Sequence, residues 1–296
     1  MGVGAGTYPA RVTSSAPAAP RPGLSPSRTN DYLQCPLLFR LRTVDRLPEA
    51  PSAAASRGTL VHAVLERVFD EPAGRRTPGL ARGLLGPAWD AMVEAEPALT
   101  GLLAAEGGLD GWFERATALI DTWFTLEDPN RLEPAEREMW VRTELDVDGT
   151  VLELRGVIDR LDVAPDGALR VVDYKTGRSP RPGYESSALF QMRFYALALE
   201  RLRGRLPAML QLVYLGDGQV LRRSPSAAEV ATTENRIRSV WTGVRSAASS
   251  GTWPTRTSRL CDWCSFRALC PAFGGTPPEP DPDAVERATG VRPLGT

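Results

Sequence analysis

Between residues 138 and 175, hydrophobic and polar residues alternate with the period of two that is typical of β-strands. The first run covers 138–147 and is followed by Asp148-Gly149, a dipeptide favoured in tight hairpin turns. A second run covers 151–163, Asp166-Gly167 supplies another turn, and a third run covers 169–175. The pattern predicts an antiparallel meander of three strands.

Helical periodicity lies on both sides of these strands in the sequence. Ser25 and Pro26 are typical of the N-cap and first position of a short helix, and 56–69 carries apolar residues three and four positions apart. The other expected elements are helical segments within 71–130, a helix over 185–203, a strand over 209–215, a short return strand after Asp217-Gly218, and a helix over 227–247. Strands flanked by helices in this way indicate a mixed α/β domain.

Both ends of the chain lack such patterns. Residues 1–23 are rich in Ala, Pro, Gly and Ser, and 274–296 are rich in Pro and Gly, so we expect a disordered tail and a flexible tail around one domain at 24–273. The absence of a long apolar run and of a secretory signal favours a cytoplasmic protein with no membrane contact. The net charge of −1 excludes a uniformly basic DNA-coating protein but leaves a nucleic-acid enzyme open.

Lysine usage is the most informative feature of the composition. Of the 35 basic residues, Lys175 is the one lysine, and His62 is the one histidine. Arginine can replace lysine for surface charge, but it cannot replace a compact ammonium group beside a reacting oxygen. The retained lysine therefore indicates a chemical role for Lys175.

The neighbours of Lys175 supply carboxylates. Residues two apart share a face of a strand, so Asp173 and Lys175 project to the same side, and the preceding turn can bring Asp159 near them. Two carboxylates suit Mg²⁺ or Mn²⁺, while the lysine could orient or deprotonate the attacking water and stabilise the developing charge. The competing interpretation is a surface strand with alternating charges. The lone lysine, the apolar Val171-Val172 before it and Asp159 all favour the metal site.

The motif Gly156-x-x-Asp159 followed by Asp173-Tyr-Lys-Thr-Gly177 resembles the PD-(D/E)XK nucleases, in particular their RecB-like branch. The resemblance implies a restriction-endonuclease-like core, which is a mixed sheet flanked by helices, with a helical N-terminal portion. The RecB-like branch also carries a glutamine and a tyrosine four residues apart on the next helix, and Gln191 and Tyr195 match them.

A histidine after an Arg-Gly pair is a further mark of that branch, and His62 follows Arg57-Gly58 in this way. Some relatives add a glutamate on the first strand, for which Glu138, Glu136 and Glu144 compete. The resemblance implies a catalytic group of Lys175, Asp173, Asp159, Gln191 and Tyr195. It implies metal binding by His62, Asp159, Asp173 and Tyr174.

The cysteines form a second group, with Cys35 far from Cys261, Cys264 and Cys270. A disulfide is disfavoured in a cytoplasmic enzyme, so four thiolates around a metal are expected, and the ligand set alone allows zinc or a 4Fe–4S cluster. The sequences around Cys35-Pro36 and Cys270-Pro271 resemble those of AddB-type helicase–nucleases and CRISPR-associated nucleases. That resemblance implies a 4Fe–4S cluster in the C-terminal segment. The cluster would connect both ends of the domain, and closing a loop of this length stabilises the folded state by about 4–5 kcal/mol.

The expected function is a metal-dependent DNA nuclease, specifically an exonuclease acting on single strands or DNA ends in recombination and repair. One alternative is a catalytically silent iron–sulfur module for DNA binding or scaffolding in a helicase–nuclease complex. Another is an iron–sulfur electron carrier. Retention of Asp159, Asp173 and Lys175 argues against both. Because the only lysine does not stand in a Gly-Lys-Ser/Thr motif, a helicase partner would be a separate polypeptide.

Overall fold

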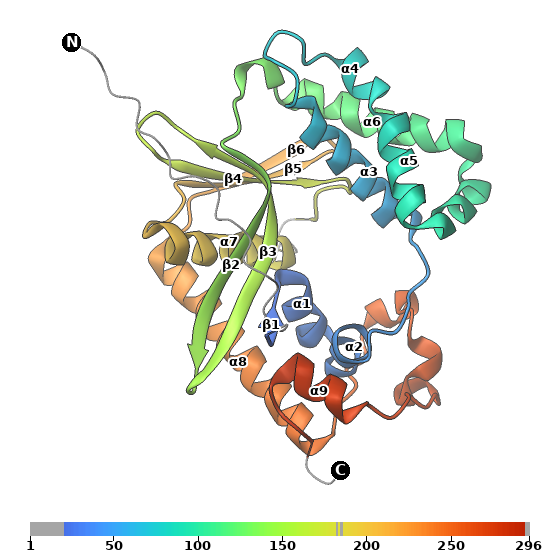
Figure 1. The fold of residues 1–296 in the computed structure, drawn as a ribbon, viewed down its shortest axis with the longest axis vertical. Coiled ribbons are helices and arrows are strands. Elements are labelled where there is room, and N and C mark those ends of the chain that lie inside the picture. The colour runs from blue at the N-terminus through green and yellow to red at the C-terminus, as the bar shows by residue number, and fades with distance from the viewer. Residues whose placement is uncertain (1–20, 182, 184–185, 294–296) are drawn as a thin grey trace.

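A computed structural model describes residues 21–181, 183 and 186–293. In this part of the chain, six strands form one mixed sheet in the order β1-β3-β4-β5-β6, and β2 pairs with the other edge of β3 (Figure 1). The strands are β1 Gly23–Leu24, β2 Glu136–Val147, β3 Thr150–Val163, β4 Leu169–Lys175, β5 Met209–Tyr214 and β6 Gln219–Arg223. The pairs β2–β3 and β3–β4 are antiparallel, which confirms the predicted meander.

Strand β3 is long enough to pair with different strands along one edge. Its residues 153–154 pair with β1 in parallel, and its residues 160–163 pair with β4. The intervening stretch, 155–159, lies between these two pairings and contains Gly156 and Asp159. The divergence of β3 from β4 therefore occurs where the sequence places its first motif.

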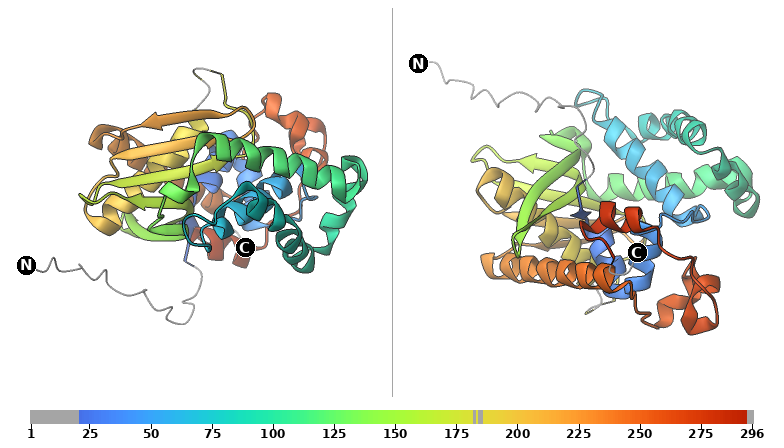
Figure 2. Two further views of the ribbon diagram at one scale, coloured as in Figure 1. Left: turned by 90° about the horizontal axis from the view of Figure 1, so that it is seen from above. Right: turned by 60° about the horizontal axis from the view of Figure 1, so that its bottom comes forward.

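Helices cover both faces of the sheet (Figures 1 and 2). On one face lie α7 Ser186–Arg203 and α8 Ala227–Ser250, which share a core with the inward residues of the strands. On the other lie α3 Ala53–Val68, α4 Pro78–Gly83, α5 Leu85–Ala95 and α6 Gly108–Leu126, with a second core of their own. Alternation along β4 divides its side chains between these cores, because Val171 faces the first and Val172 the second.

The N-terminal helices α1 Pro26–Gln34 and α2 Pro36–Phe39 pack near the C-terminal part of the chain (Figure 2). Helix α2 continues into a π-helical turn, Arg40–Val44, which the sequence pattern did not predict. The remaining elements are 3₁₀ turns at Pro97–Glu106, Pro129–Arg131, Arg259–Trp263, Arg267–Leu269 and Pro271–Phe273. No helix in the described ranges is long and apolar enough to cross a membrane.

Within 274–296, for which we expect a flexible tail, residues Pro282–Thr289 form helix α9. Asp281 caps this helix, and its apolar side places Val285 and Thr289 in buried positions against the first core. The Pro- and Gly-rich composition of this segment gave no sign of the helix, which packs against α8. The expected tail over 1–20 and the predicted helix start at residue 185 lie outside the described residues.

Candidate functional site

Three possible metal ligands meet between helix α3 and the β2–β3 hairpin. His62 Nδ1 lies 3.6 Å from Asp159 Oδ2 and 3.9 Å from Glu138 Oε1. One ligand atom from each residue lies within 4.8 Å of the other two. A nitrogen and two carboxylate oxygens at this spacing can face a single cation.

The register of the hairpin brings the two carboxylates together. Arg137 pairs with Arg160 and Met139 with Ile158, so Glu138 stands opposite Asp159. Glu138 has a φ of 43°, a conformation that costs energy for residues other than glycine and is often retained at functional sites. The main-chain N–H of Tyr174 donates to Asp159 Oδ2 at 2.7 Å, so this side chain bridges the gap where β3 leaves β4.

Helix α3 presents His62 with a defined orientation. Its Nε2 lies 3.1 Å from the main-chain carbonyl oxygen of Tyr174, which leaves Nδ1 facing the carboxylates. One turn earlier on the helix, a Cβ at Gly58 would lie 3.2 Å from Thr176 Oγ1. The Arg-Gly pair that precedes the histidine thus allows α3 to approach the end of β4 closely.

A second group of polar residues lies on the α7 side of β4. Lys175 Nζ lies 2.6 Å from Asp173 Oδ2 and donates to Gln191 Oε1 at 2.8 Å. The amide nitrogen of Gln191 donates to Asp173 Oδ1 at 2.9 Å and also lies 3.2 Å from the Tyr195 hydroxyl. Asp173 is 2% exposed, so these contacts fix a buried carboxylate and hold the lysine beside it.

Gly156 allows Tyr195 to reach this group. A Cβ at position 156 would lie 2.7 Å from Tyr195 Cε1, which is shorter than carbon atoms tolerate. Helix periodicity places Gln191 and Tyr195 on one face of α7, and the tyrosine ring packs over the glycine. The contact with the Tyr195 ring therefore explains why the Gly-x-x-Asp motif begins with a glycine.

The charges of the two groups influence one another. Burial and the nearby Asp173 carboxylate raise the pKa of Asp159 to about 7. Burial would lower the pKa of His62, but the Glu138 hydrogen bond and the charges of Asp159 and Asp173 outweigh it and raise that pKa. A site that holds this much negative charge in a partly buried position favours cation binding.

An open groove of about 570 Å³ gives access from solvent to His62, Glu138 and Lys175. Its walls also include Thr59, Gly177 and Arg178, which lie at the ends of α3 and β4. A substrate in this groove could contact both the ligand group and the lysine.

Tyr174, for which the resemblance implies metal binding, reaches the site with its main chain and not with its side chain. Its side chain points into the second core, where its hydroxyl contacts Arg160 and Glu127. Only its main chain faces the site, through the carbonyl near His62 and the N–H that binds Asp159.

The competing glutamates lie elsewhere on β2. Glu136 stands opposite Leu161, and Glu144 pairs with the exposed Arg21 near the far end of the hairpin.

Sequence reasoning missed a buried ion pair directly behind the site. Arg160 is 1% exposed and makes two hydrogen bonds of 2.8 Å to the carboxylate of Glu127. Trp123 and Gln211 also donate to that carboxylate, at 2.8 and 3.1 Å. Because Arg160 follows Asp159 and contacts Tyr174, this pair supports the strand on which the site is built. The sequence signal for this ion pair is the arginine that directly follows Asp159.

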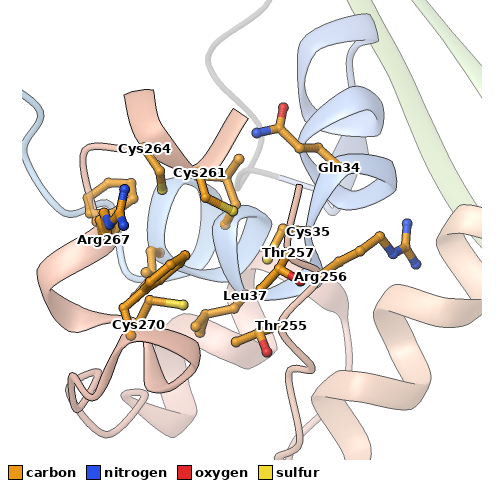
Figure 3. A pocket seen from close by; sticks show the side chains of 14 residues that line it. Gln34, Cys35, Leu37, Thr255, Arg256, Thr257, Cys261, Cys264, Arg267 and Cys270 are labelled. Carbon is orange, nitrogen blue, oxygen red and sulfur yellow. The ribbon is translucent and has the colours of Figure 1, made fainter. Parts of the chain in front are cut away.

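The four cysteines line one cavity between α2 and the C-terminal segment (Figure 3). Cys35 lies at the junction of α1 and α2, where the main-chain N–H of Leu37 donates to Pro254 O at 3.3 Å. Within the described ranges, no three cysteine sulfurs lie within 4.8 Å of one another. The fold therefore gathers the cysteines around a cavity without bringing them into a tight group.

Several known proteins are similar to this chain. The chain is 27% identical over 205 residues to the Gene 69 protein of Mycobacterium phage D29, covering 61% of this chain and 70% of that protein. It is 23% identical over 286 residues to the Gene 69 protein of Mycobacterium phage L5, covering 84% and 96%. The crystal structure of SSO0001 aligns with a TM-score of 0.37 and 18% identity, over 74% of this chain and 97% of that one. Residues 23–271 match the PD-(D/E)XK nuclease superfamily, and the chain therefore belongs to that superfamily.

Proposed function

We propose that this protein is a deoxyribonuclease that hydrolyses phosphodiester bonds with a divalent cation held by His62, Glu138 and Asp159. The observation that carries the proposal is the meeting of these ligand atoms within 4.8 Å of one another, beside Lys175 and at an accessible groove. Asp173 lies close enough to raise the pKa of Asp159 and would add negative charge to the same site.

The donor set fits Mg²⁺ or Mn²⁺. Carboxylate oxygens are the ligands that both cations prefer, while an imidazole nitrogen favours the transition metal. We therefore expect Mn²⁺ to bind more tightly than Mg²⁺. The cation, when bound, would polarise the scissile phosphate and lower the pKa of a water.

The protein's own residues would position the reactants. Lys175 Nζ is held by Asp173 and Gln191, so its charge would face the scissile phosphate without a further change of side-chain conformation. From there it would orient the attacking water and stabilise the negative charge that develops on the phosphate oxygens. Gln191 and Tyr195 would keep Asp173 and the lysine in register.

The finer proposal is an exonuclease of the RecB-like branch that acts on single strands in recombination and repair. The proposal is supported by three features taken together: the carboxylates with Lys175, the pair Gln191 and Tyr195, and His62 after Arg57-Gly58. These 296 residues hold no Gly-Lys-Ser/Thr motif, and the proposal includes a helicase partner that acts in trans.

We also propose that the four cysteines bind a 4Fe–4S cluster. Zinc–sulfur bonds of about 2.3 Å place the sulfurs of a tetrahedral site within roughly 3.8 Å of one another. Among the described residues no three cysteine sulfurs are this close, so the preference for a 4Fe–4S cluster over zinc rests on the resemblance of the segments around Cys35-Pro36 and Cys270-Pro271. The cluster would connect α1 and α2 to the C-terminal segment.

The test is digestion of end-labelled single-stranded DNA by anaerobically purified protein, with Mn²⁺, with Mg²⁺ and with chelator. Lys175→Ala and Asp159→Asn are the test variants, and Arg203→Ala is the control, because it changes an exposed basic residue at the end of α7. The proposal requires metal-dependent cleavage that both test variants lose and the control retains. Folded, metal-bound wild-type protein that cleaves neither single- nor double-stranded DNA would instead support the silent DNA-binding module.

A further inference from the structure

The β2–β3 hairpin carries an exposed tryptophan close to the proposed metal site. Trp140 is 71% exposed, although it lies between Met139, which packs on the first core, and the buried Val141. Its exposed indole offers a flat apolar ring on which a planar ligand could stack, close to the proposed site.

The position of Trp140 relative to the site follows from the register. Trp140 pairs with Val157, and this pair lies two residues along the strands from Glu138 and Asp159. Two residues of a strand span about 7 Å, so the ring lies within one or two nucleotides of the proposed cleavage position. Its neighbour Val141 faces the first core, so Trp140 faces the other side, on which helix α3 presents His62.

Arginines continue this surface away from the site. Arg142 pairs directly with Arg155 across the two strands, an arrangement of like charges that destabilises a sheet unless an anion compensates. Both approach the same carboxylate, Glu153, at 3.4 and 3.5 Å. One carboxylate cannot neutralise two guanidinium groups, so a positive charge remains.

Helix α1 adds Arg28 to this cluster. Burial, with smaller contributions from the charges of Arg155 and Arg46, lowers the pKa of Arg28 to about 10, so this guanidinium group lies near both arginines. Asp31 and Glu153 act in the opposite direction on Arg28, but Asp31 is paired with Arg42.

We infer that this face of the β2–β3 hairpin binds a single strand of DNA, with Trp140 stacking on a base and Arg142 and Arg155 contacting phosphates. The inference rests on the proposed nuclease function and adds the path that leads the strand to the site. An exposed aromatic ring, followed by two arginines that share one carboxylate, provides base stacking and backbone attraction, the two interactions that proteins use for single strands without reading sequence.

Binding is measured separately from cleavage, with a fluorescent single-stranded oligonucleotide in chelator, by anisotropy. We expect Trp140→Ala to weaken binding by about 5- to 100-fold, the range measured for loss of one stacked base, and Trp140→Phe to retain most of the affinity. Val151→Ala is the matched control, because it removes another exposed apolar side chain from the same hairpin.

An abasic nucleotide moved along the oligonucleotide identifies the stacked base. The wild-type protein should bind more weakly to an oligonucleotide that lacks the base at one particular position. Trp140→Ala should bind that abasic oligonucleotide as well as it binds the intact one. Arg142→Ala should reduce the slope of log affinity against log salt by about 0.7, with Arg203→Ala as control.

The outcomes separate this inference from the proposed function. Metal-dependent cleavage together with unchanged binding by Trp140→Ala would overturn the inference and leave the nuclease intact. Binding that depends on Trp140 and shows an abasic-sensitive position would support the inference even in a protein that cleaves nothing. An equal loss of affinity in Val151→Ala would also overturn it, because the effect would then come from the hairpin as a whole.

Discussion

Glu138 stands directly opposite Asp159 in the β2–β3 register, and both carboxylates face His62 Nδ1 on helix α3. The glutamate and the aspartate belong to one hairpin, whereas His62 comes from a distant helix, and Glu138 adopts a φ of 43° at this point. The strain is local to one residue of a strand that is otherwise regularly paired. We interpret this geometry as the cost of directing two carboxylates to one point, and it underlies the first prediction.

The stabilising effect of Mn²⁺ should increase with pH. Asp159 has a pKa of about 7 in the folded protein, against an ordinary value of 3.8, so the folded state holds a proton that the unfolded state has released between these values. Stability without a cation should therefore fall as pH rises through this window. A cation replaces the proton, so the rise in Tm caused by Mn²⁺ should be small near pH 5 and large near pH 8.

Thermal unfolding with Mn²⁺ and with chelator, across that pH range, measures this effect. Asp159→Asn is the control, because it removes the titrating carboxyl and should flatten the pH dependence. Equal Mn²⁺-induced shifts at both ends of the range would contradict the assignment of Asp159 as a ligand.

Lysine at position 175 should not be replaceable by arginine. A guanidinium group is larger and planar, so it cannot occupy the space in which Nζ contacts both Asp173 and Gln191. We expect Lys175→Arg to lose about 10²- to 10³-fold in cleavage rate, the range for removal of one electrostatic contact in a transition state. The rate of label release under single-turnover conditions measures it.

The reverse exchange at a surface position, Arg203→Lys, provides the control for Lys175→Arg and should leave the rate unchanged. Substantial cleavage by Lys175→Arg would mean that any positive charge suffices at this position.

A methyl group at position 156 should disturb Tyr195. The added Cβ would meet the tyrosine ring at 2.7 Å, and overpacking of this kind costs about 1–3 kcal/mol. Gly156→Ala should therefore lower Tm by several degrees and reduce activity through the displaced Gln191. In a Tyr195→Ala background the same change should cost much less, and a double-mutant cycle measures the difference.

Gly83→Ala serves as the control for this cycle, because a Cβ there meets no atom within 4 Å and glycine is unfavourable in a helix. If the effects of Gly156→Ala and Tyr195→Ala were simply additive, the proposed contact would not be the reason for the glycine.

Removing Glu127 should destabilise the fold more than removing any surface acid. Glu127→Ala leaves the buried Arg160 without its main partner, and breaking a buried pair in this way costs about 3–5 kcal/mol. Asp121→Ala, which breaks an exposed pair with Arg82, should cost less than about 1 kcal/mol. Urea unfolding measures both, and similar values would show that Arg160 finds other partners in the variant.

The proposed 4Fe–4S cluster predicts that loss of a cysteine removes bound iron and loosens both ends of the domain. On that proposal, Cys35→Ser or Cys270→Ser should abolish the visible absorbance of the cluster and lower stability by about 4–5 kcal/mol, because loss of the cluster opens the loop that it would close. Metal and sulfide analysis of anaerobic protein provides the measurement, with Ser265→Ala as the control in the same segment. Stoichiometric zinc without iron would contradict the cluster.

Much of the fold could be read from local patterns. The alternation over 138–175 and the two Asp-Gly turns determined the antiparallel meander, because strand faces and short turns depend on neighbouring residues alone. The same alternation placed Asp173 and Lys175 on one side of β4, and helix periodicity placed Gln191 and Tyr195 together on α7.

Tertiary structure decided the rest, because it depends on contacts between distant segments. The choice of Glu138 among three glutamates follows from its position opposite Asp159, a register that the Asp148-Gly149 turn fixes locally. The meeting of both carboxylates with His62, in contrast, depends on how helix α3 packs against the hairpin. The turn of Tyr174 into the second core and the pairing of Arg160 with Glu127 depend on how α6 packs against the sheet. The sequence by itself determined which residues could do chemistry, while long-range packing decided which of them meet.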